Sequence, residues 1–225
     1  MNNENKLHIG LQKLGFSTQA IQQISEKLTA YANELHTNNH LYGLTAIHDY
    51  DEIIVRHILD SLAAYDELQN IKNAVYEHET PFVIADIGSG GGIPGIPLAI
   101  AMSDIDFVLI ERMAKRCAFL EHCVSALDLK NVTIENKEVE RIEQNRFDIV
   151  VFRAFRPFEK KILRVLLRIL KDNGVLLAYK GKKQKIEEEM ASVAPHISHY
   201  SIKQLNVPFL EDYERHAVCI QKHCR

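Results

Sequence analysis

The chain has 225 residues, a formal net charge of −3 and 46% hydrophobic residues. This length is enough for one globular core with an additional segment. The balanced charge excludes recognition of nucleic acid by overall charge alone. No apolar run reaches the roughly 18 residues that a membrane span needs, and the first residues lack the charged-then-apolar pattern of a signal peptide. We therefore expect a cytoplasmic protein without a membrane segment.

Residues 1–75 are predicted to be helical and to form an N-terminal segment that packs on the core of the protein. Ser17 is a typical helix N-cap, and helically spaced apolar residues follow it up to Leu35. The polar residues 36–40 are expected to interrupt this helix. Asp49 and Glu52 have the pattern that begins another helix.

That second helix carries polar side chains among many apolar neighbours, namely Arg56, His57, Asp60 and Ser61. Their spacing allows two interpretations. These side chains either satisfy one another or line the solvent face, or they serve a functional site. The spacing by itself favours the first interpretation.

From Pro81 onward, predicted strands and helices alternate, so residues 76–225 are expected to form one Rossmann-like α/β domain with a mostly parallel sheet. The first five strands are predicted over residues 82–87, 107–110, 132–134, 147–152 and 175–179. A turn at residues 172–174 is expected to lead into the fifth strand. Two further β-like runs, about 199–205 and 216–221, are expected to complete the sheet with a reversed final strand.

A glycine-rich turn directly follows the first strand and contains Gly88, Ser89, Gly90, Gly91 and Gly92. Strand, glycine turn and helix form the opening of a nucleotide-binding α/β unit. Gly90, Gly92 and Gly95 also satisfy the dinucleotide fingerprint, and a purely structural turn is a third interpretation. Asp86 favours S-adenosylmethionine, because a carboxylate at the mouth of the site attracts a sulfonium and an ammonium but repels a pyrophosphate.

Other polar residues follow the ends of predicted strands, where ligands bind in doubly wound sheets. Glu111 ends the second strand, at the position where an acid takes ribose hydroxyls. The full set of such residues is Asp86, Glu111, Glu140, Arg153 and Lys180. Their common position is the strongest indication of a site that the residues give without reference to a family.

Cysteines and histidines give no metal-binding pattern. Cys117, Cys123, Cys219 and Cys224 lack Cys-x-x-Cys spacing, which indicates reduced thiols. His196 and His199 have no further ligands nearby in the sequence. We therefore expect no metal site.

Several motifs together resemble one known family. They are the segment Arg56-His57-Ile58-Leu59-Asp60-Ser61, the run from Asp86 through Pro97, the Arg153-Ala154-Phe155 motif, and the pairs Lys115-Arg116, Lys180-Gly181 and Arg215-His216. They occur in family order from about residue 40 onward. On these motifs the chain resembles the glucose-inhibited division protein B family, the ribosomal RNA small-subunit methyltransferase G enzymes. The class I S-adenosylmethionine-dependent methyltransferase fold is what this resemblance implies.

The resemblance also implies an activity, namely methyl transfer from S-adenosyl-L-methionine to N7 of a guanine in 16S ribosomal RNA. The implied partner is 16S ribosomal RNA or the small ribosomal subunit, and we expect a monomer. Implied catalytic residues are Arg153, His57, Asp60 and Ser61. Implied cofactor-binding residues are Asp86, Gly88, Ser89, Gly90, Gly92, Glu111, Val139, Glu140 and Arg153. The family usually has Asn at the position of Gly43 and Arg at that of Glu138, so we expect a change in loop rigidity and in cofactor affinity.

Two other classes of function stay open at this point. One is a methyltransferase that acts on a small molecule or a protein, and the other is a non-catalytic RNA-binding module on the same fold. Hydrolysis by a Ser-His-Asp set is disfavoured, because His57, Asp60 and Ser61 lie within two turns of one helix and not at a nucleophile elbow. Basic residues at 160–168 and 180–185 are candidates for RNA contact.

Overall fold

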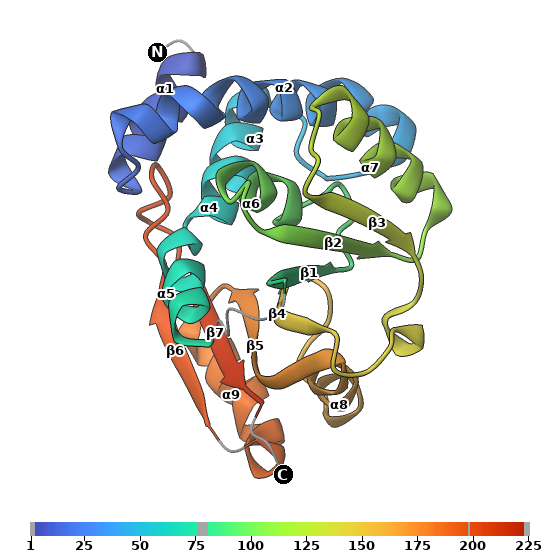
Figure 1. Cartoon of the computed structure of the whole chain (residues 1–225). Coiled ribbons are helices and arrows are strands. Elements are labelled where there is room, and N and C mark those ends of the chain that lie inside the picture. Colours follow the sequence, from blue (N-terminus) through green and yellow to red (C-terminus); the bar gives the residue numbers. More distant parts are fainter. Residues whose placement is uncertain (1–2, 76–80, 198, 223–225) are drawn as a thin grey trace.

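A seven-stranded sheet runs through the middle of the computed structural model, which describes residues 3–75, 81–197 and 199–222 (Figure 1). The strands are β1 (Val83–Ile87), β2 (Asp106–Glu111), β3 (Val132–Asn136), β4 (Phe147–Arg153), β5 (Leu170–Lys180), β6 (Tyr200–Gln204) and β7 (His216–Gln221). Their order in the sheet is β3-β2-β1-β4-β5-β7-β6. The first five strands are parallel and β7 is antiparallel to both its neighbours. This confirms the predicted α/β fold with a reversed final strand.

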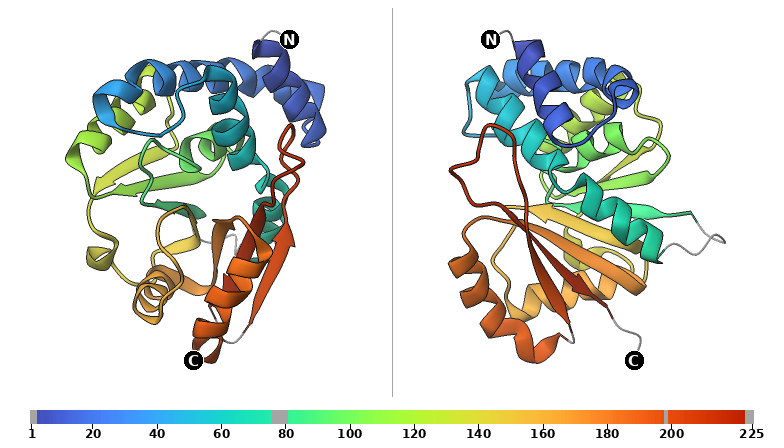
Figure 2. Two further views of the ribbon diagram at one scale, coloured as in Figure 1. Left: turned by 180° about the vertical axis from the view of Figure 1, so that it is seen from behind. Right: turned by 90° about the vertical axis from the view of Figure 1, so that its left-hand side faces the viewer.

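Alternate residues of each strand face the two sides of the sheet, and each side is covered by its own helices. On one side Ile84 and Val151 join a core with the N-terminal helices and with α6 (Gly95–Ala101) and α7 (Ala114–Ala126). On the other side Ile87 and Val150 pack with α8 (Lys160–Ile169) and α9 (Lys183–Val193). Figure 2 shows the two helical layers from further directions. Because both faces are covered, the central strands are apolar throughout.

The N-terminal layer consists of α1 (Asn3–Lys13), α2 (Thr18–Tyr42), α5 (Tyr65–Val75) and one helical stretch between residues 50 and 62. This stretch begins as α3 (Tyr50–Ile53), widens to the π-helical segment η1 (Ile54–Leu59) and ends as α4 (Asp60–Leu62). Ser17 and Asp49 cap their helices by accepting from backbone N–H groups, as predicted. π-helical turns are rare and occur frequently at functional sites.

The prediction that residues 36–40 interrupt the helix is wrong, because α2 continues to Tyr42 and ends at Gly43. The reason is Asn39, which is buried and uses its side-chain amide to bind the loop that follows the helix. Its Oδ1 accepts from the N–H groups of Leu44 and Thr45, and its Nδ2 donates to the carbonyl oxygens of Thr45 and Ile47. Asn39 therefore holds the loop of residues 44–47 in place, and Gly43 itself serves as a helix cap.

Residues 172–174 lie inside β5, where a separate turn before the strand was expected. The register between β4 and β5 shifts between Phe147 and Ile149, and this irregularity absorbs Asn173 with its positive φ of 62°. None of the described helices is long and apolar enough to cross a membrane. The boundary between residues 75 and 76 stays a prediction, because the helices before it and the sheet after it share one core.

The glycine turn after β1 is packed too closely to accept a side chain at Gly92. Its φ is +93°, and a Cβ there would lie 2.5 Å from Cδ1 of Ile96 and 3.1 Å from Cδ2 of Leu120. Gly15 has a similar φ of +88° but no heavy atom within 4 Å of its Cβ position. Gly92→Ala should therefore lower the free energy of unfolding by about 1–3 kcal/mol more than Gly15→Ala. Both variants place an L-residue at a positive φ, but only the Cβ at position 92 overlaps neighbouring side chains. Urea denaturation measures both, and equal losses would contradict this account of the turn.

Candidate active site

Two adjoining cavities open at the carboxyl ends of the parallel strands. The first cavity has a volume of about 290 Å³ and is lined by residues 87–88, 110–113, 116, 137–140 and 154–156. The second cavity has a volume of about 550 Å³ and is lined by residues 47, 56–57, 60, 153–157, 179–181 and 215. Residues 154–156, the loop after β4, line both. A group bound in one cavity can thus face a group bound in the other across this loop.

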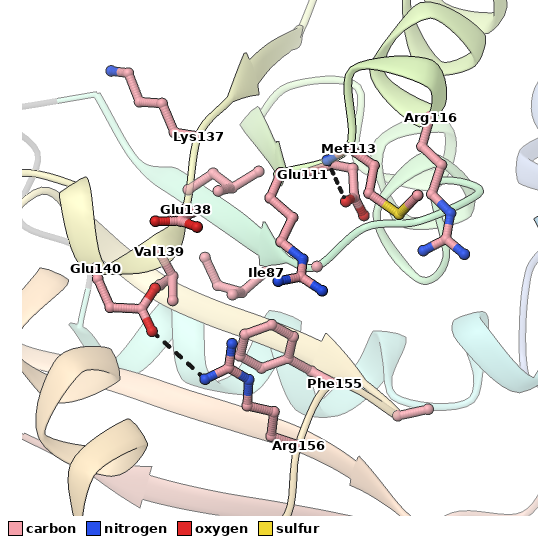
Figure 3. A pocket seen from close by; sticks show the side chains of 14 residues that line it. Ile87, Glu111, Met113, Arg116, Lys137, Glu138, Val139, Glu140, Phe155 and Arg156 are labelled. Atoms are coloured by element: carbon pink, nitrogen blue, oxygen red, sulfur yellow. Dashed lines mark hydrogen bonds and ion pairs between the residues drawn. The ribbon is translucent and has the colours of Figure 1, made fainter.

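Glu111 anchors the first cavity. This residue ends β2 and is buried, and its two carboxylate oxygens accept from different segments of backbone. Oε2 accepts from Gly90 N–H at 3.0 Å and Oε1 accepts from Met113 N–H at 2.9 Å, as Figure 3 shows for Met113. The carboxylate therefore ties the glycine turn to the start of α7 while it lines the cavity.

The opposite wall of the first cavity comes from Val139 and Glu140, in the short 3₁₀ turn Val139–Arg141. Val139 is buried and presents an apolar surface, whereas Glu140 forms an ion pair of 3.5 Å with Arg156 (Figure 3). Phe155 lines the cavity from the loop after β4, next to Arg156 and beside Gly88 (Figure 3). Glu138 also lines this cavity, on the same wall as Val139. An apolar wall facing a hydrogen-bonded carboxylate suits a ligand with an aromatic ring and hydroxyl groups.

The glycine turn contributes Gly88 to the lining of the first cavity, whereas Ser89, Gly90 and Gly92 are not among the lining residues. Hydrogen bonds on the side away from the cavity fix the backbone of the turn. Gly92 N–H donates to the Ser89 carbonyl at 2.7 Å, and the hydroxyl of Tyr31 in α2 donates to the Gly91 carbonyl at 2.6 Å. The N-terminal layer thus touches the turn directly.

The prediction that Asp86 stands at the mouth of the site is wrong, because its side chain is fully buried and lines neither cavity. Asp86 shares the strand face of Ile84 and points toward α6, where Oδ2 accepts from Gly95 N–H at 3.0 Å. Oδ1 is buried and has no hydrogen-bond partner among the described residues. Burial raises the pKa of Asp86 to about 7, although the hydrogen bond from Gly95 opposes this shift.

Arg153 is the centre of the second cavity. It ends β4 on the face of the N-terminal layer, so its guanidinium reaches the helical stretch of residues 50–62. Nη1 donates to the Arg56 carbonyl at 2.7 Å and to Asp60 Oδ2 at 2.9 Å, and Nη2 lies 2.9 Å from His57 Nδ1. The structure therefore brings together Arg153, His57 and Asp60, which the sequence predicted as one site.

His57 is buried and neutral. Burial, followed by the positive charge of Arg153, lowers its pKa from 6.5 to about 3. Nδ1 lies 2.9 Å from Arg153 Nη2 and 3.0 Å from the Arg56 carbonyl, which already accepts from Arg153 Nη1. Because a guanidinium can only donate, we assign Nδ1 as the acceptor from Arg153 and place the ring proton on Nε2. Nε2 lies 2.7 Å from Thr45 Oγ1, in the loop that Asn39 holds. A ring in this state orients Arg153 and has no free nitrogen with which to act as a base.

Asp60 joins two arginines from distant parts of the chain. Its side chain is 4% exposed, with Oδ2 bound to Arg153 and Oδ1 at 3.2 Å from Arg215 Nε. It is the only carboxylate among the residues that line the second cavity. The same lining contains five cationic side chains, those of Arg56, Arg153, Arg156, Lys180 and Arg215. Glu52, Glu140 and Glu189, which lie outside this lining, pair with Arg56, Arg156 and Lys180, so the second cavity is rich in cationic hydrogen-bond donors but has only a small excess of positive charge.

Ser61 is the one predicted catalytic residue that the structure keeps away from both cavities. It is fully buried, and its hydroxyl donates to the His57 carbonyl at 2.5 Å. Its own carbonyl accepts from the hydroxyl of Tyr179 at 2.6 Å. Ser61 therefore satisfies backbone groups of the widened π-helical segment and does not face a ligand.

The described part of the chain contains no group of three His, Cys, Asp or Glu side chains that could hold a metal ion. Cys117, Cys123 and Cys219 are buried free thiols, and Cys224 lies outside the described residues.

Sequence reasoning missed several residues that build the site. Tyr31 and Tyr179 are embedded in apolar segments, and Asn39 lies in a polar stretch that resembles a helix break. Thr45 and Arg215 belong to motifs without an obvious chemical role in the sequence. Each acts through a partner more than 10 residues away, except for the local contacts of Asn39, so spacing carries no signal for it.

The same arrangement of sheet and helices occurs in solved structures of methyltransferases. A SAM-dependent methyltransferase from Aquifex aeolicus superposes with a TM-score of 0.56 at 15% identity, over 86% of this chain and 98% of that one. At this identity the likeness shows the fold alone. The fold and its strand order are those of the class I S-adenosylmethionine-dependent methyltransferases.

The family is shown by the sequence itself. The family model described as rRNA small subunit methyltransferase G matches residues 24–218. The chain is 40% identical to ribosomal RNA small subunit methyltransferase G of Treponema denticola, covering 95% of this chain and 92% of that protein. It is 32% identical to the protein of the same name from Neisseria meningitidis, covering 99% and 100%. The chain therefore belongs to the rRNA small subunit methyltransferase G family, which confirms the predicted resemblance and that the protein is a methyltransferase.

The neutral state of His57 predicts how stability depends on pH. The pKa of His57 is about 3 in the folded protein and about 6.5 in the unfolded chain. The unfolded chain therefore gains a proton first as the pH falls, so the contribution of His57 to the free energy of unfolding is complete above pH 6.5 and is lost as the pH falls toward 3. Between about pH 7.5 and pH 5.5, His57 alone should lower the free energy of unfolding by about 1.4 kcal/mol. His57→Gln keeps an N–H donor toward Thr45 and removes this titration. Urea denaturation at both pH values should show the gap between the two proteins narrowing at the lower pH, and a constant gap would contradict the assignment.

Proposed function

We propose that the protein transfers a methyl group from S-adenosyl-L-methionine to N7 of a guanine in 16S ribosomal RNA. The observation that carries this proposal is the pair of adjoining cavities that share the loop after β4. The first combines an apolar wall with the backbone-bonded carboxylate of Glu111, whereas in the second Arg153 and Arg215 converge on the carboxylate of Asp60. A polyanion with an unpaired base suits the second cavity, since arginine and lysine bind phosphates and base edges. Membership of the family supports the same substrate.

The residues of the first cavity fit an adenosine-containing cofactor. Glu111 has one lone pair left on each oxygen after its two backbone bonds, and ribose hydroxyls can donate to them. Val139 offers an apolar surface to a purine, and Gly88 and Glu140 complete the set. Asp86 lines neither cavity, and we assign it to the support of the turn, because its carboxylate binds the N–H of Gly95 behind that turn.

The proposed chemistry needs orientation more than acid–base catalysis. S-adenosylmethionine, when bound, supplies an electrophilic methyl group. Guanine N7 is unprotonated at neutral pH and needs no general base, which agrees with a neutral His57 whose nitrogens are both engaged. Arg153 uses three of its five N–H groups on Arg56, His57 and Asp60, so two are left for a base edge or phosphate. The residues of the second cavity thus orient the guanine.

RNA contact beyond the cavity is proposed for the exposed first turns of α8 and α9. Lys160, Lys161 and Arg164 project from α8, and Lys182 and Lys185 lie at the start of α9. Both helices follow strands whose ends line the second cavity, β4 and β5. We further propose that the helical segment 1–75 supports the methyltransferase domain 76–225, and that the protein acts as a monomer in the cytoplasm.

The activity is tested by mapping N7-methylguanine in 16S ribosomal RNA. Chemical cleavage at N7-methylguanine, read by primer extension, should show one site in cells with the gene and no modification at that site after its deletion. Purified protein with S-adenosylmethionine should restore the site on small subunits or RNA from the deletion strain. An unchanged pattern after deletion, together with methylation of another class of molecule, would overturn the proposal.

Arg153→Lys tests the role of the guanidinium. Lysine keeps the charge but cannot serve Asp60, His57 and a substrate from one planar fork. Methyl transfer should fall at least about tenfold while the calorimetric affinity for S-adenosylmethionine stays within a few-fold. Arg56→Lys is the matched control, because the Arg56 side chain lines the same cavity but pairs only with Glu52 and Tyr213. If Arg153→Lys stays fully active, or fails only because its melting temperature collapses, Arg153 has no direct role in transfer.

A further inference from the structure

Two buried tyrosines each donate a hydrogen bond from the hydroxyl group to a backbone carbonyl, one beside each cavity. The Tyr31 hydroxyl in α2 donates to the Gly91 carbonyl, and the Tyr179 hydroxyl in β5 donates to the Ser61 carbonyl, both at 2.6 Å. The side chains are 0% and 5% exposed. Tyr31 therefore links the glycine turn to α2, and Tyr179 links the end of the helical stretch of residues 50–62 to β5. Burial raises the pKa of both phenols well above 10, so both hydroxyls stay donors at all relevant pH values.

Hydrogen bonds to three other residues attach the glycine turn to the rest of the protein. The Ile110 carbonyl accepts from the N–H groups of Gly88 and Ser89, Glu111 accepts from Gly90 N–H, and the Tyr31 hydroxyl donates to the Gly91 carbonyl. Leu35 of the N-terminal layer packs close to the same point, since a Cβ on Gly91 would lie 3.0 Å from Leu35 Cδ2. Of these three residues, Tyr31 is the one that belongs to the N-terminal layer.

Tyr179 completes a different chain of bonds, around the π-helical segment η1. A π turn displaces the regular pattern of backbone hydrogen bonds. Ser61 Oγ donates to the His57 carbonyl, and Tyr179 donates to the Ser61 carbonyl one turn later. These bonds fix the backbone that carries His57 and Asp60, and through them the position of Arg153.

We infer that Tyr31 and Tyr179 are positioning residues with separate tasks, Tyr31 for the cofactor turn and Tyr179 for the RNA-binding cavity. The inference rests on the proposed function for the second task, because only the reaction with RNA reports on it. The first task is read by cofactor binding alone. Both tasks have the same physical basis. A buried carbonyl that loses its hydrogen-bond donor is unfavourable, so the backbone segment that contains it shifts to find another donor.

The two Tyr→Phe variants are matched controls for each other, since each removes one buried hydroxyl from one carbonyl. Tyr31→Phe should raise the calorimetric dissociation constant of S-adenosylmethionine roughly five- to tenfold, with kcat and the KM for RNA within twofold at saturating cofactor. Tyr179→Phe should lower kcat/KM for RNA by a similar factor and leave the cofactor dissociation constant within twofold. Thermal denaturation of both proteins should show similar, modest losses.

A merely structural role would lower both melting temperatures and leave the binding and kinetic constants of the folded proteins unchanged, which would overturn the inference. Equal effects of both variants on cofactor and RNA would also overturn it. If either variant does not fold, Gly91→Ala replaces Tyr31→Phe and Ser61→Ala replaces Tyr179→Phe, because each disturbs the same segment from within. The same selective losses are then expected.

Assays of the wild-type protein distinguish a failure of this inference from a failure of the proposed function. A wild type that binds S-adenosylmethionine but does not methylate 16S ribosomal RNA would refute the proposed substrate, while the Tyr31 result stays interpretable. A wild type that methylates the RNA, with no selective loss in either variant, would refute only the positioning roles.

Discussion

The buried ion pair between Asp60 and Arg153 is the interaction on which the second cavity depends. It joins the helical stretch of the N-terminal layer to the end of β4, across 93 positions of sequence. Removing one partner from a buried pair typically costs about 3–5 kcal/mol, because the other charge is left without compensation. Arg215 adds a second cation to the same carboxylate from the far end of the chain. Three distant segments therefore meet at one carboxylate.

This arrangement explains why the N-terminal helices are part of the site. The sheet alone would present Arg153 at its edge with no partner, as a mobile cation. The helical layer supplies Asp60 and His57 to orient it, Thr45 to hold His57, and Tyr31 to hold the glycine turn. Both cavities are thus shaped on one side by the strand ends and on another by elements that precede the sheet in the chain.

The two cavities differ in how their charged groups are used. In the first, both oxygens of Glu111 accept from backbone N–H groups, so only their remaining lone pairs can accept from a ligand. In the second, Arg153 and Arg215 share the carboxylate of Asp60, the other cations pair with carboxylates outside the lining, and neutral His57 adds no further charge. A positive purine product would be repelled there without the phosphates that RNA brings, which makes a polynucleotide a better match than a free base.

The order of strands and helices could be predicted without the structure, because apolar runs, caps and glycine turns are local signals. The strands β1 to β7 and the caps Ser17 and Asp49 follow these signals. Positions at strand ends also indicated Glu111 and Arg153, whereas the spacing of His57 and Asp60 favoured a structural role and only the family resemblance assigned them to the site. Only the tertiary structure decided which side each residue faces. Asp86 lies behind the turn because strand residues alternate between faces, and Ser61 serves the backbone because a π turn leaves carbonyls to satisfy. The roles of Tyr31 and Tyr179 depend on hydrogen bonds to residues far away in the sequence, and that of Asn39 depends on a loop that folds back onto its helix. The spacing of residues along the sequence does not predict such contacts.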